Sequence, residues 1–286
     1  MHKYFKRIRV LMFVLVIVTV SCEKEVVLDL YSPAESFLIV EGDIDDRLAT
    51  QWIRLTSSSS YYDQTPAPPV SNAMVTISDG ETDYYFRESR EDSLKGYYLN
   101  SALSSNLKEG IYYLKVEIEE EIYNSQSEFK TSPVIDSVTF DLNIFSRLGI
   151  TADTIFDISI HFTNIDGNDI YFLTNLYING RLRTVRPQDK TIFRGEDLTD
   201  YVSLAVNTIE RGDIDDGDLV TVEIRSISMG QYDFYNDFFS QTSLSGNPFA
   251  GAPPANIPTN LSEGALGFFQ VSSSQIIERE FTSSWE

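Results

Sequence analysis

The sequence contains little of the side-chain chemistry that enzymes and metal sites most often use. Among 286 residues there are one cysteine and two histidines, and the first histidine lies near the N-terminus in a leader segment. A lone cysteine cannot form an internal disulfide, and zinc sites of the Cys/His type need several such ligands. Catalysis of the Ser-His-Asp kind needs an imidazole, for which His161 alone remains, and no G-x-S-x-G elbow accompanies it. We therefore expect no enzymatic activity and no cofactor.

Basic residues are also scarce. The chain has 22 Lys and Arg residues against 43 Asp and Glu residues, which gives a net charge of −21 at pH 7. Residues 1–21 carry four of the basic groups and no acid, so the chain without them has a net charge of −25. Binding to a phosphate backbone needs clustered Lys and Arg. We therefore exclude nucleic acid as a partner.

The N-terminus has the three-part layout of a secretory signal. A basic segment is followed by an apolar run from Val10 to Val20 and then by the small residue Ser21. The apolar run is shorter than the roughly 20 residues that a membrane-spanning helix needs. We therefore interpret residues 1–21 as a cleaved lipoprotein signal peptide.

The single cysteine follows this signal directly. Thr19-Val20-Ser21-Cys22 resembles the bacterial lipobox, in which signal peptidase II cuts before the cysteine and the cysteine becomes acylated. Two or three acyl chains give stable attachment to a bilayer. The acidic Glu23-Lys24-Glu25 resembles the export signal that sends lipoproteins of Bacteroidota to the cell surface. We expect Cys22 to be the lipid anchor, with residues 22–35 as a tether; a periplasm-facing lipoprotein is the alternative.

From Ser36 onward, short β-favouring runs alternate with turn residues. In residues 114–119 (LKVEIE) apolar and charged residues alternate strictly, which is typical of a strand with one face in the core. Turn signals recur about every ten residues, which favours antiparallel sandwiches. Thr131-Ser132-Pro133 interrupts the pattern because proline cannot serve a central strand. The sequence thus predicts an all-β protein of two antiparallel β-sandwich-like (Ig-like) domains, residues 36–131 and 132–286.

One segment of the second domain is predicted to be helical. Tyr232, Tyr235 and Phe239 fall on one face at helical spacing, so we expect a short helix near residues 231–243. A proline-rich loop follows at residues 245–264, with Phe249 near its centre. Long loops often contact partners, although this one could also cover a sheet edge.

Four pairs of adjacent tyrosines place one ring on each face of a strand. We expect one ring of each pair in the core and the other at least partly exposed. Exposed tyrosines can bind sugars, peptides or proteins, although cross-strand packing is the more common role. Tyr61 and Tyr62, together with Phe249, are our candidates for partner contact. The pairs are Tyr61-Tyr62, Tyr84-Tyr85, Tyr97-Tyr98 and Tyr112-Tyr113.

An acidic stretch at residues 213–218 (DIDDGD) is a weak candidate for calcium through Asp213, Asp215 and Asp218. It departs from the EF-hand pattern, because Gly217 stands where an oxygen ligand belongs. A turn before the strand LVTVEI is the favoured interpretation. The same five residues, GDIDD, occur at 42–46 after FLIVE, where we expect a second turn at a strand edge.

His161 belongs to a strand with polar residues at odd positions and apolar residues at even positions, from 156 to 162. This alternation predicts that the imidazole lies on the polar, solvent-exposed face of a sheet. A catalytic triad built on it is not supported.

Several segments have a recognisable order along the chain: the lipobox cysteine with its Glu/Lys cluster, residues 40–42 (VEG), 217–228 (GDLVTVEIRSIS) leading into 232–235 (YDFY), and 258–261 (PTNL) with 264–269 (GALGFF). Together they resemble a known family of Bacteroidota lipoproteins, grouped as domain of unknown function 4249. The resemblance spans essentially the whole chain and implies a two-part, mostly β, outer-membrane lipoprotein. Such proteins are often encoded beside a TonB-dependent transporter and have no established activity.

We therefore expect an outer-membrane lipoprotein, anchored in the bilayer through Cys22 and facing the cell surface. Its expected role is that of a noncatalytic binding or accessory subunit, acting with a TonB-dependent transporter in nutrient uptake. One alternative is a surface hydrolase that uses paired carboxylates, which a tight cluster of carboxylates in a cleft would favour. A structural or adhesive surface protein is another.

Overall fold

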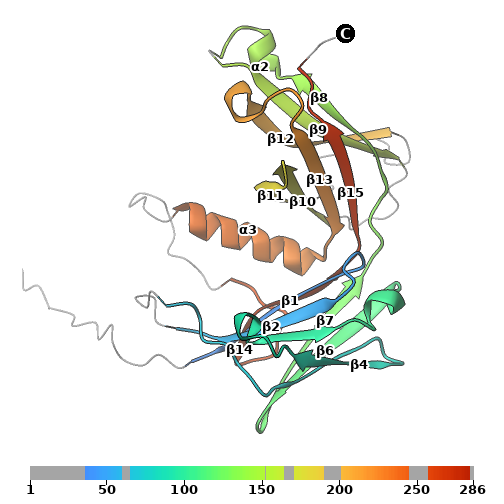
Figure 1. Cartoon of the computed structure of the whole chain (residues 1–286), viewed down its shortest axis with the longest axis vertical. Coiled ribbons are helices and arrows are strands. Elements are labelled where there is room, and N and C mark those ends of the chain that lie inside the picture. The colour runs from blue at the N-terminus through green and yellow to red at the C-terminus, as the bar shows by residue number, and fades with distance from the viewer. Residues whose placement is uncertain are drawn as a thin grey trace, which may run out of the picture. The chain divides into compact units, whose positions relative to one another are not determined.

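A computed structural model describes residues 36–59, 65–151, 153–163, 171–189, 201–244 and 257–283 (Figure 1). The strands are β1 (Leu38–Asp45), β2 (Gln51–Ser57), β3 (Met74–Ser78), β4 (Asp83–Glu88), β5 (Tyr97–Asn100), β6 (Gly110–Ile118), β7 (Glu121–Phe129), β8 (Ile135–Leu142), β9 (Ile155–Thr163), β10 (Tyr171–Ile178), β11 (Arg181–Asp189), β12 (Tyr201–Glu210), β13 (Leu219–Ser226), β14 (Ala265–Ser272) and β15 (Ser274–Glu280). The helices are α2 (Ile144–Arg147), α3 (Met229–Leu244) and the short 3₁₀ turns η1 (Asp92–Leu94), η2 (Ser104–Asn106) and η4 (Arg211–Asp213).

The first sheet has the strand order β14-β1-β2-β5-β4-β3-β6-β7. Its pairs are antiparallel except β1 with β14, which run parallel. Its two edge strands also meet, because the backbone N–H of Val271 on β14 donates to Ser127 Oγ on β7 at 2.9 Å. The inner faces enclose one hydrophobic core, which includes Val40, Leu55 and Leu114. The sheet is therefore folded into a sandwich-like arrangement.

Strand β6 shows how the sequence pattern produces this arrangement. Leu114 and Val116 are buried in the core, whereas Lys115 between them is exposed. Adjacent tyrosines divide in the same way: Tyr112 is buried and Tyr113 is exposed, and on β4 Tyr84 is buried and Tyr85 exposed. The predicted separation of these tyrosine pairs between two faces is confirmed, because successive strand side chains point to opposite sides.

The second part of the fold contains two further sheets, β11-β10-β13-β15 and β12-β9-β8. Side chains of both sheets form one core, including Ile158, Leu176, Val222 and Phe281. The rings of Phe156 and Phe281 contact edge to face, with centroids 5.0 Å apart. The predicted all-β class with sandwich-like sheets is confirmed, and α3 includes the predicted helix at 231–243.

The chain returns to the first sheet near its C-terminal end. The predicted boundary, Thr131-Ser132-Pro133, lies between β7 and β8. The prediction places residues 265–272 in the second domain, but this segment is β14, which pairs with β1 and adds Phe269 and Val271 to the first core. After Ser273, β15 pairs with β13 of the second sheet. Strand periodicity shows that such a segment is a strand, but it does not identify the partner strand.

Gly267 allows β14 to approach β1 closely. Its φ of +100° lies in a region that side-chain-bearing residues rarely adopt, and a Cβ atom there would lie 2.1 Å from the carbonyl oxygen of Val40. Glycine at this position is thus required both by the backbone conformation and by the lack of space.

His161 differs from its expected environment. It lies on the face of β9 away from the hydrophobic core, as the alternation predicts, but only 8% of the residue is exposed. Strand β9 lies between β8 and β12, and Ser137 and Ser203 stand opposite His161 on either side. A ring nitrogen, Nε2, forms a hydrogen bond with Thr139 Oγ1 at 2.8 Å. The prediction of exposure was wrong because β9 is the central strand of its sheet, and residues of the flanking strands β8 and β12 lie on both sides of the ring.

Among the described residues, none of the helices has both the length and the apolar character needed to cross a bilayer.

Candidate functional site

Four residues singled out from the sequence lie outside the described residues. These are the lipidation candidate Cys22 and the partner-contact candidates Tyr61, Tyr62 and Phe249. Their roles stay predictions.

The acidic stretch before β13 forms a hydrogen-bonded turn. Asp218 Oδ2 accepts from the backbone N–H of Asp215 at 2.8 Å, and its Oδ1 accepts from Asn179 Nδ2 at 2.7 Å. These bonds, led by the one from Asp215, lower the pKa of Asp218. Asp213 belongs to the 3₁₀ turn η4. In the part of the chain that the structure describes, no group of three or more His, Cys, Asp or Glu side chains is placed to hold a metal ion.

Asp216 connects the same turn to Arg211 and to Ser283 through hydrogen bonds. It accepts from Arg211 Nη2 at 2.9 Å and from the backbone N–H of Ser283 at 2.6 Å. The bond from Arg211, followed by those from Ser283, holds the pKa of Asp216 far below its usual range. The carboxylates of Asp216 and Asp218 thus stabilise the loop that leads into β13.

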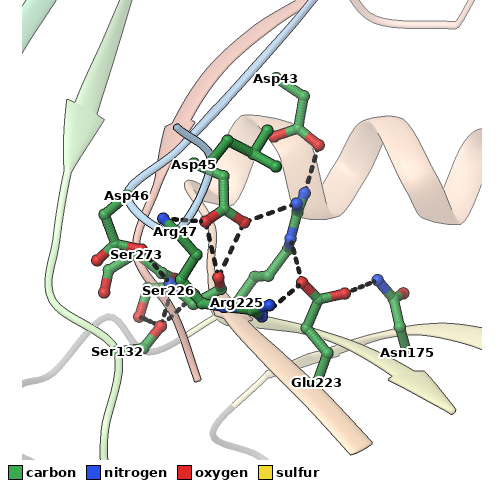
Figure 2. A network of polar contacts seen from close by, with 12 residues as sticks. Asp43, Asp45, Asp46, Arg47, Ser132, Asn175, Glu223, Arg225, Ser226 and Ser273 are labelled. Carbon is green, nitrogen blue, oxygen red and sulfur yellow. Dashed lines mark hydrogen bonds and ion pairs between the residues drawn. The ribbon is translucent and has the colours of Figure 1, made fainter. Parts of the chain in front are cut away.

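A partly buried cluster of charged side chains forms around Arg225 of β13 (Figure 2). We call it the arginine cluster, and it consists of Arg225, Asp43, Asp45, Glu223 and Arg47. The guanidinium pairs with Asp43, with Asp45 Oδ2 at 2.8 Å and, through Nε, with Glu223 Oε1 at 3.3 Å. Arg47 reaches the same Glu223 oxygen at 3.5 Å. Asp43 and Asp45 lie on β1 of the first sheet, so these ion pairs connect the first sheet to the second.

Hydrogen bonds around the arginine cluster extend this connection. Asp45 accepts from Ser274 Oγ at 2.8 Å, next to the turn between β14 and β15. Ser132, in the linker between the predicted domains, donates to the carbonyl of Ser273 at 2.5 Å and accepts from the N–H of Ser226 at 2.8 Å. The linker, the β14–β15 turn and β13 are therefore joined through short polar side chains.

Each carboxylate of the arginine cluster is paired with an arginine side chain. Burial by itself would lower the pKa of Arg225, but the carboxylates of Asp43, Glu223 and Asp45 more than offset it and the pKa is raised. Burial raises the pKa of the Asp43 carboxyl, although Arg225 opposes the change. Nearby, burial and then the charge of Asp43 raise the pKa of Tyr235 on α3 to about 12. The guanidinium lies between the carboxylates, so they act as its ion-pair partners.

The sequence signal for this cluster was misinterpreted. The GDIDD stretch at 42–46 was expected to be a turn at a strand edge, but β1 continues to Asp45, and only 2% of Asp45 is exposed. Asp43 and Asp45 are two residues apart and share a strand face, as do Glu223 and Arg225. This spacing is visible in the sequence, but the pairing of the two faces depends on the tertiary structure.

An open groove of about 560 Å³ lies on the outer face of β3, β4, β6 and β7. We call it the tyrosine groove. Tyr85 and Tyr113 are 59% and 46% exposed. Between their strands runs β3, where Thr76 stands opposite Tyr85 and Ser78 opposite Tyr113. The lining residues are Met74, Thr76, Ser78, Asp83, Tyr85, Tyr113, Leu114, Lys115, Glu117, Asn124 and Ser125.

The tyrosine groove combines flat rings with hydrogen-bonding groups. Lys115 and Glu117 form an ion pair beside Tyr113 on β6. Asp83 and Asn124 add a carboxylate and an amide on the neighbouring strands β4 and β7. Such a surface can bind a ligand through ring contacts and polar side chains. The sequence predicted that one ring of each tyrosine pair faces outward, but only the pairing of β4, β3 and β6 brings Tyr85 and Tyr113 to one groove.

Comparisons with known proteins give one informative match. No curated protein matches the chain. Among solved structures, a chain titled "Cytokine receptor complex - Crystal form 1A" aligns with a TM-score of 0.28 and 9% identity, covering 86% of this chain and 97% of that one. A likeness at this level supports no conclusion. The family model described as "Domain of unknown function (DUF4249)" matches residues 23–277. Because this match spans most of the sequence, the chain belongs to that family of domains of unknown function.

Proposed function

We propose that the protein is a noncatalytic lipoprotein of the outer membrane that binds an extracellular ligand as an accessory subunit of a TonB-dependent transporter. In this proposal the acylated Cys22 anchors the chain in the bilayer, and the folded sheets lie on the outer side of the cell. The observation that carries the binding role is the tyrosine groove, where Tyr85 and Tyr113 are exposed to solvent beside polar side chains. Ligand sites typically combine a concave surface with a few well-placed polar groups.

The anchor rests on the sequence. The leader ends in Thr19-Val20-Ser21-Cys22, and the family match begins at the next residue, 23. Residues 22–35 then supply a tether before β1. The transporter partner and the cell-surface location rest on the resemblance to Bacteroidota lipoproteins and on the acidic residues after Cys22.

The arrangement of the charged side chains favours binding over hydrolysis. A glycosidase needs two carboxyl groups facing the scissile bond across a substrate site. In the arginine cluster, Arg225 lies between the carboxylates of Asp43, Asp45 and Glu223, and its own side chain is 14% exposed. His161 is buried and hydrogen-bonded to Thr139.

Copurification tests the proposal. The full-length protein is solubilised in detergent from the outer membrane of its own cells and captured by an affinity tag, and the recovered proteins are identified by mass spectrometry. We expect a TonB-dependent transporter in stoichiometric amount and an acylated N-terminal cysteine on the mature protein. Cys22→Ala is the control, because without the anchor the protein leaves the membrane fraction. Recovery of the acylated protein alone contradicts the accessory role and supports an adhesive surface protein.

A further inference from the structure

We propose that the tyrosine groove binds a neutral oligosaccharide or polysaccharide. This inference rests on the proposed binding function and names the ligand class for the same groove. Its first support is the layout of the rings. Tyr85 and Tyr113 lie on β4 and β6, on either side of the short side chains Thr76 and Ser78 of β3. The two large tyrosine side chains form the walls of the groove, and the smaller threonine and serine side chains between them form its floor.

The distance between the rings suits an extended ligand. Thr76 pairs with Tyr85 on one side and with Lys115 on the other, and Tyr113 lies two residues from Lys115. With strands about 4.8 Å apart and a rise of about 3.4 Å per residue, the Cα atoms of the two tyrosines lie about 12 Å apart. A single sugar ring cannot contact both walls across that distance, whereas a short chain of linked rings can. The groove is also open, so a longer chain can continue past either wall.

The chemistry of the lining matches that of a sugar. Each pyranose ring has an apolar face of C–H groups and a rim of hydroxyl groups. The tyrosine rings present flat, amphipathic surfaces for the C–H faces. Asp83 and Asn124 accept or donate hydrogen bonds at the rim, and Thr76 adds a hydroxyl at the floor. Hydrogen-bond donors and acceptors lie next to the exposed rings, which distinguishes this groove from a purely apolar patch.

Charge decides between the possible ligands. The chain has a net charge of −21, so polyanions such as nucleic acids or sulfated glycans are repelled. The basic group of the groove, Lys115, is already paired with Glu117. A protein partner would need an apolar interface centre with few charged residues. Here Asp83, Lys115 and Glu117 share the groove with the tyrosines, so a neutral polyhydroxylated ligand fits best.

Affinity electrophoresis of the full-length protein in detergent tests this inference. The native gels contain one soluble polysaccharide each: hydroxyethylcellulose, xylan, laminarin, mannan, dextran or starch, with heparin as a polyanionic comparison. We expect at least one neutral polysaccharide to retard the protein and heparin to have no effect. Tyr85→Ala and Tyr113→Ala each weaken the retarding interaction about twofold to tenfold, since each removes one ring contact. The double variant loses it.

Matched variants separate ring stacking from folding. Tyr85→Phe and Tyr113→Phe keep the ring and are expected to bind nearly as well as the native chain. Leu182→Ala, at an equally exposed position on β11, is expected to bind unchanged. Circular dichroism and thermal unfolding establish that each variant is folded before its binding is compared.

Three results would overturn the inference: no retardation by any neutral polysaccharide, retardation that survives the double alanine change, or loss of the copurifying transporter in that double variant. The last result makes the tyrosine groove a protein interface. In that case the accessory function still stands, so failure of the glycan proposal is distinguishable from failure of the proposed function.

Discussion

The arginine cluster and the tyrosine groove use the same alternation of side chains in opposite ways. On β1, Asp43 and Asp45 turn one strand face into a charged surface that is covered by Arg225. On β4 and β6, Tyr85 and Tyr113 turn apolar rings toward solvent. Charged groups are thus buried where they meet opposite charges, and aromatic groups are exposed where none of the described segments covers the sheet. The comparison shows that residue type alone does not decide burial.

The largest expected effect comes from removing the central cation. Arg225→Met removes the cation that pairs with Asp43, Asp45 and Glu223 and leaves Glu223 only its longer contact with Arg47, so we expect the free energy of unfolding to fall by about 3–5 kcal/mol. Arg211→Met is the control, because it breaks an exposed pair with Asp216 and should therefore destabilise the fold far less than Arg225→Met does. Urea unfolding at pH 7 measures both. Equal losses would mean that burial does not distinguish the two arginines.

The adjacent tyrosines Tyr112 and Tyr113 allow a buried ring and an exposed ring of the same strand to be tested side by side. Tyr112→Ala removes a buried ring that packs edge to face on Phe129 at 6.5 Å, and we expect a loss of about 3–4 kcal/mol. Tyr113→Ala removes an exposed ring and should change the free energy of unfolding by less than about 0.5 kcal/mol. The measurement is again urea unfolding. A large loss for Tyr113→Ala would show that its ring is structural and would weaken the groove as a binding site.

The close packing of β14 against β1 predicts that a side chain at Gly267 lowers the free energy of unfolding. Gly267→Ala combines a positive φ with a Cβ atom 2.1 Å from the Val40 carbonyl oxygen, so we expect a loss of about 2–4 kcal/mol. Gly217→Ala is matched to it, because its φ is +93° but open space surrounds the added methyl. We expect Gly217→Ala to lose about 1–2 kcal/mol in thermal unfolding, from the backbone term alone. Similar values for both variants would remove the argument from crowding.

The smallest expected effect is a pH dependence at His161. Burial lowers the pKa of this imidazole below its ordinary value of 6.5, while the charge of Asp141 opposes the shift. The unfolded chain then binds a proton at a higher pH than the folded chain does, so stability falls as the pH drops below about 6.5. The loss stops growing below the folded-state pKa.

His161→Gln removes this titration while keeping a polar side chain. We expect the free energy of unfolding of the native chain to fall more between pH 7.5 and pH 5 than that of the variant. Parallel pH profiles for the two proteins would show that the imidazole titrates alike in the folded and unfolded states.

Features of the candidate site that depend on neighbouring residues could be predicted from the sequence, whereas contacts between residues far apart along the chain could not. The alternation of strand side chains correctly predicted that one ring of the pair Tyr112-Tyr113 lies in the core and the other is exposed, because strand periodicity is a local property. The neighbour relation of Tyr85 and Tyr113 was not predictable, since it requires β3 to pair with both β4 and β6. The predicted exposure of His161 was wrong for a similar reason. Its face of β9 was predicted correctly, but its burial depends on the neighbouring strands β8 and β12.

Local sequence patterns were enough to predict the strand-rich class, the helix near 231–243 and the separation of Tyr84-Tyr85 and of Tyr112-Tyr113 between two sheet faces. These features follow from side-chain periodicity and turn residues, which act over a few neighbouring positions. Three features depend on the tertiary fold: β14 pairs with β1, Arg225 pairs with Asp43 and Asp45, and Tyr85 and Tyr113 line one groove. Each of these contacts joins segments that are distant along the chain. Strand patterns are interchangeable among partners, so only complementary packing and charge select one pairing from many.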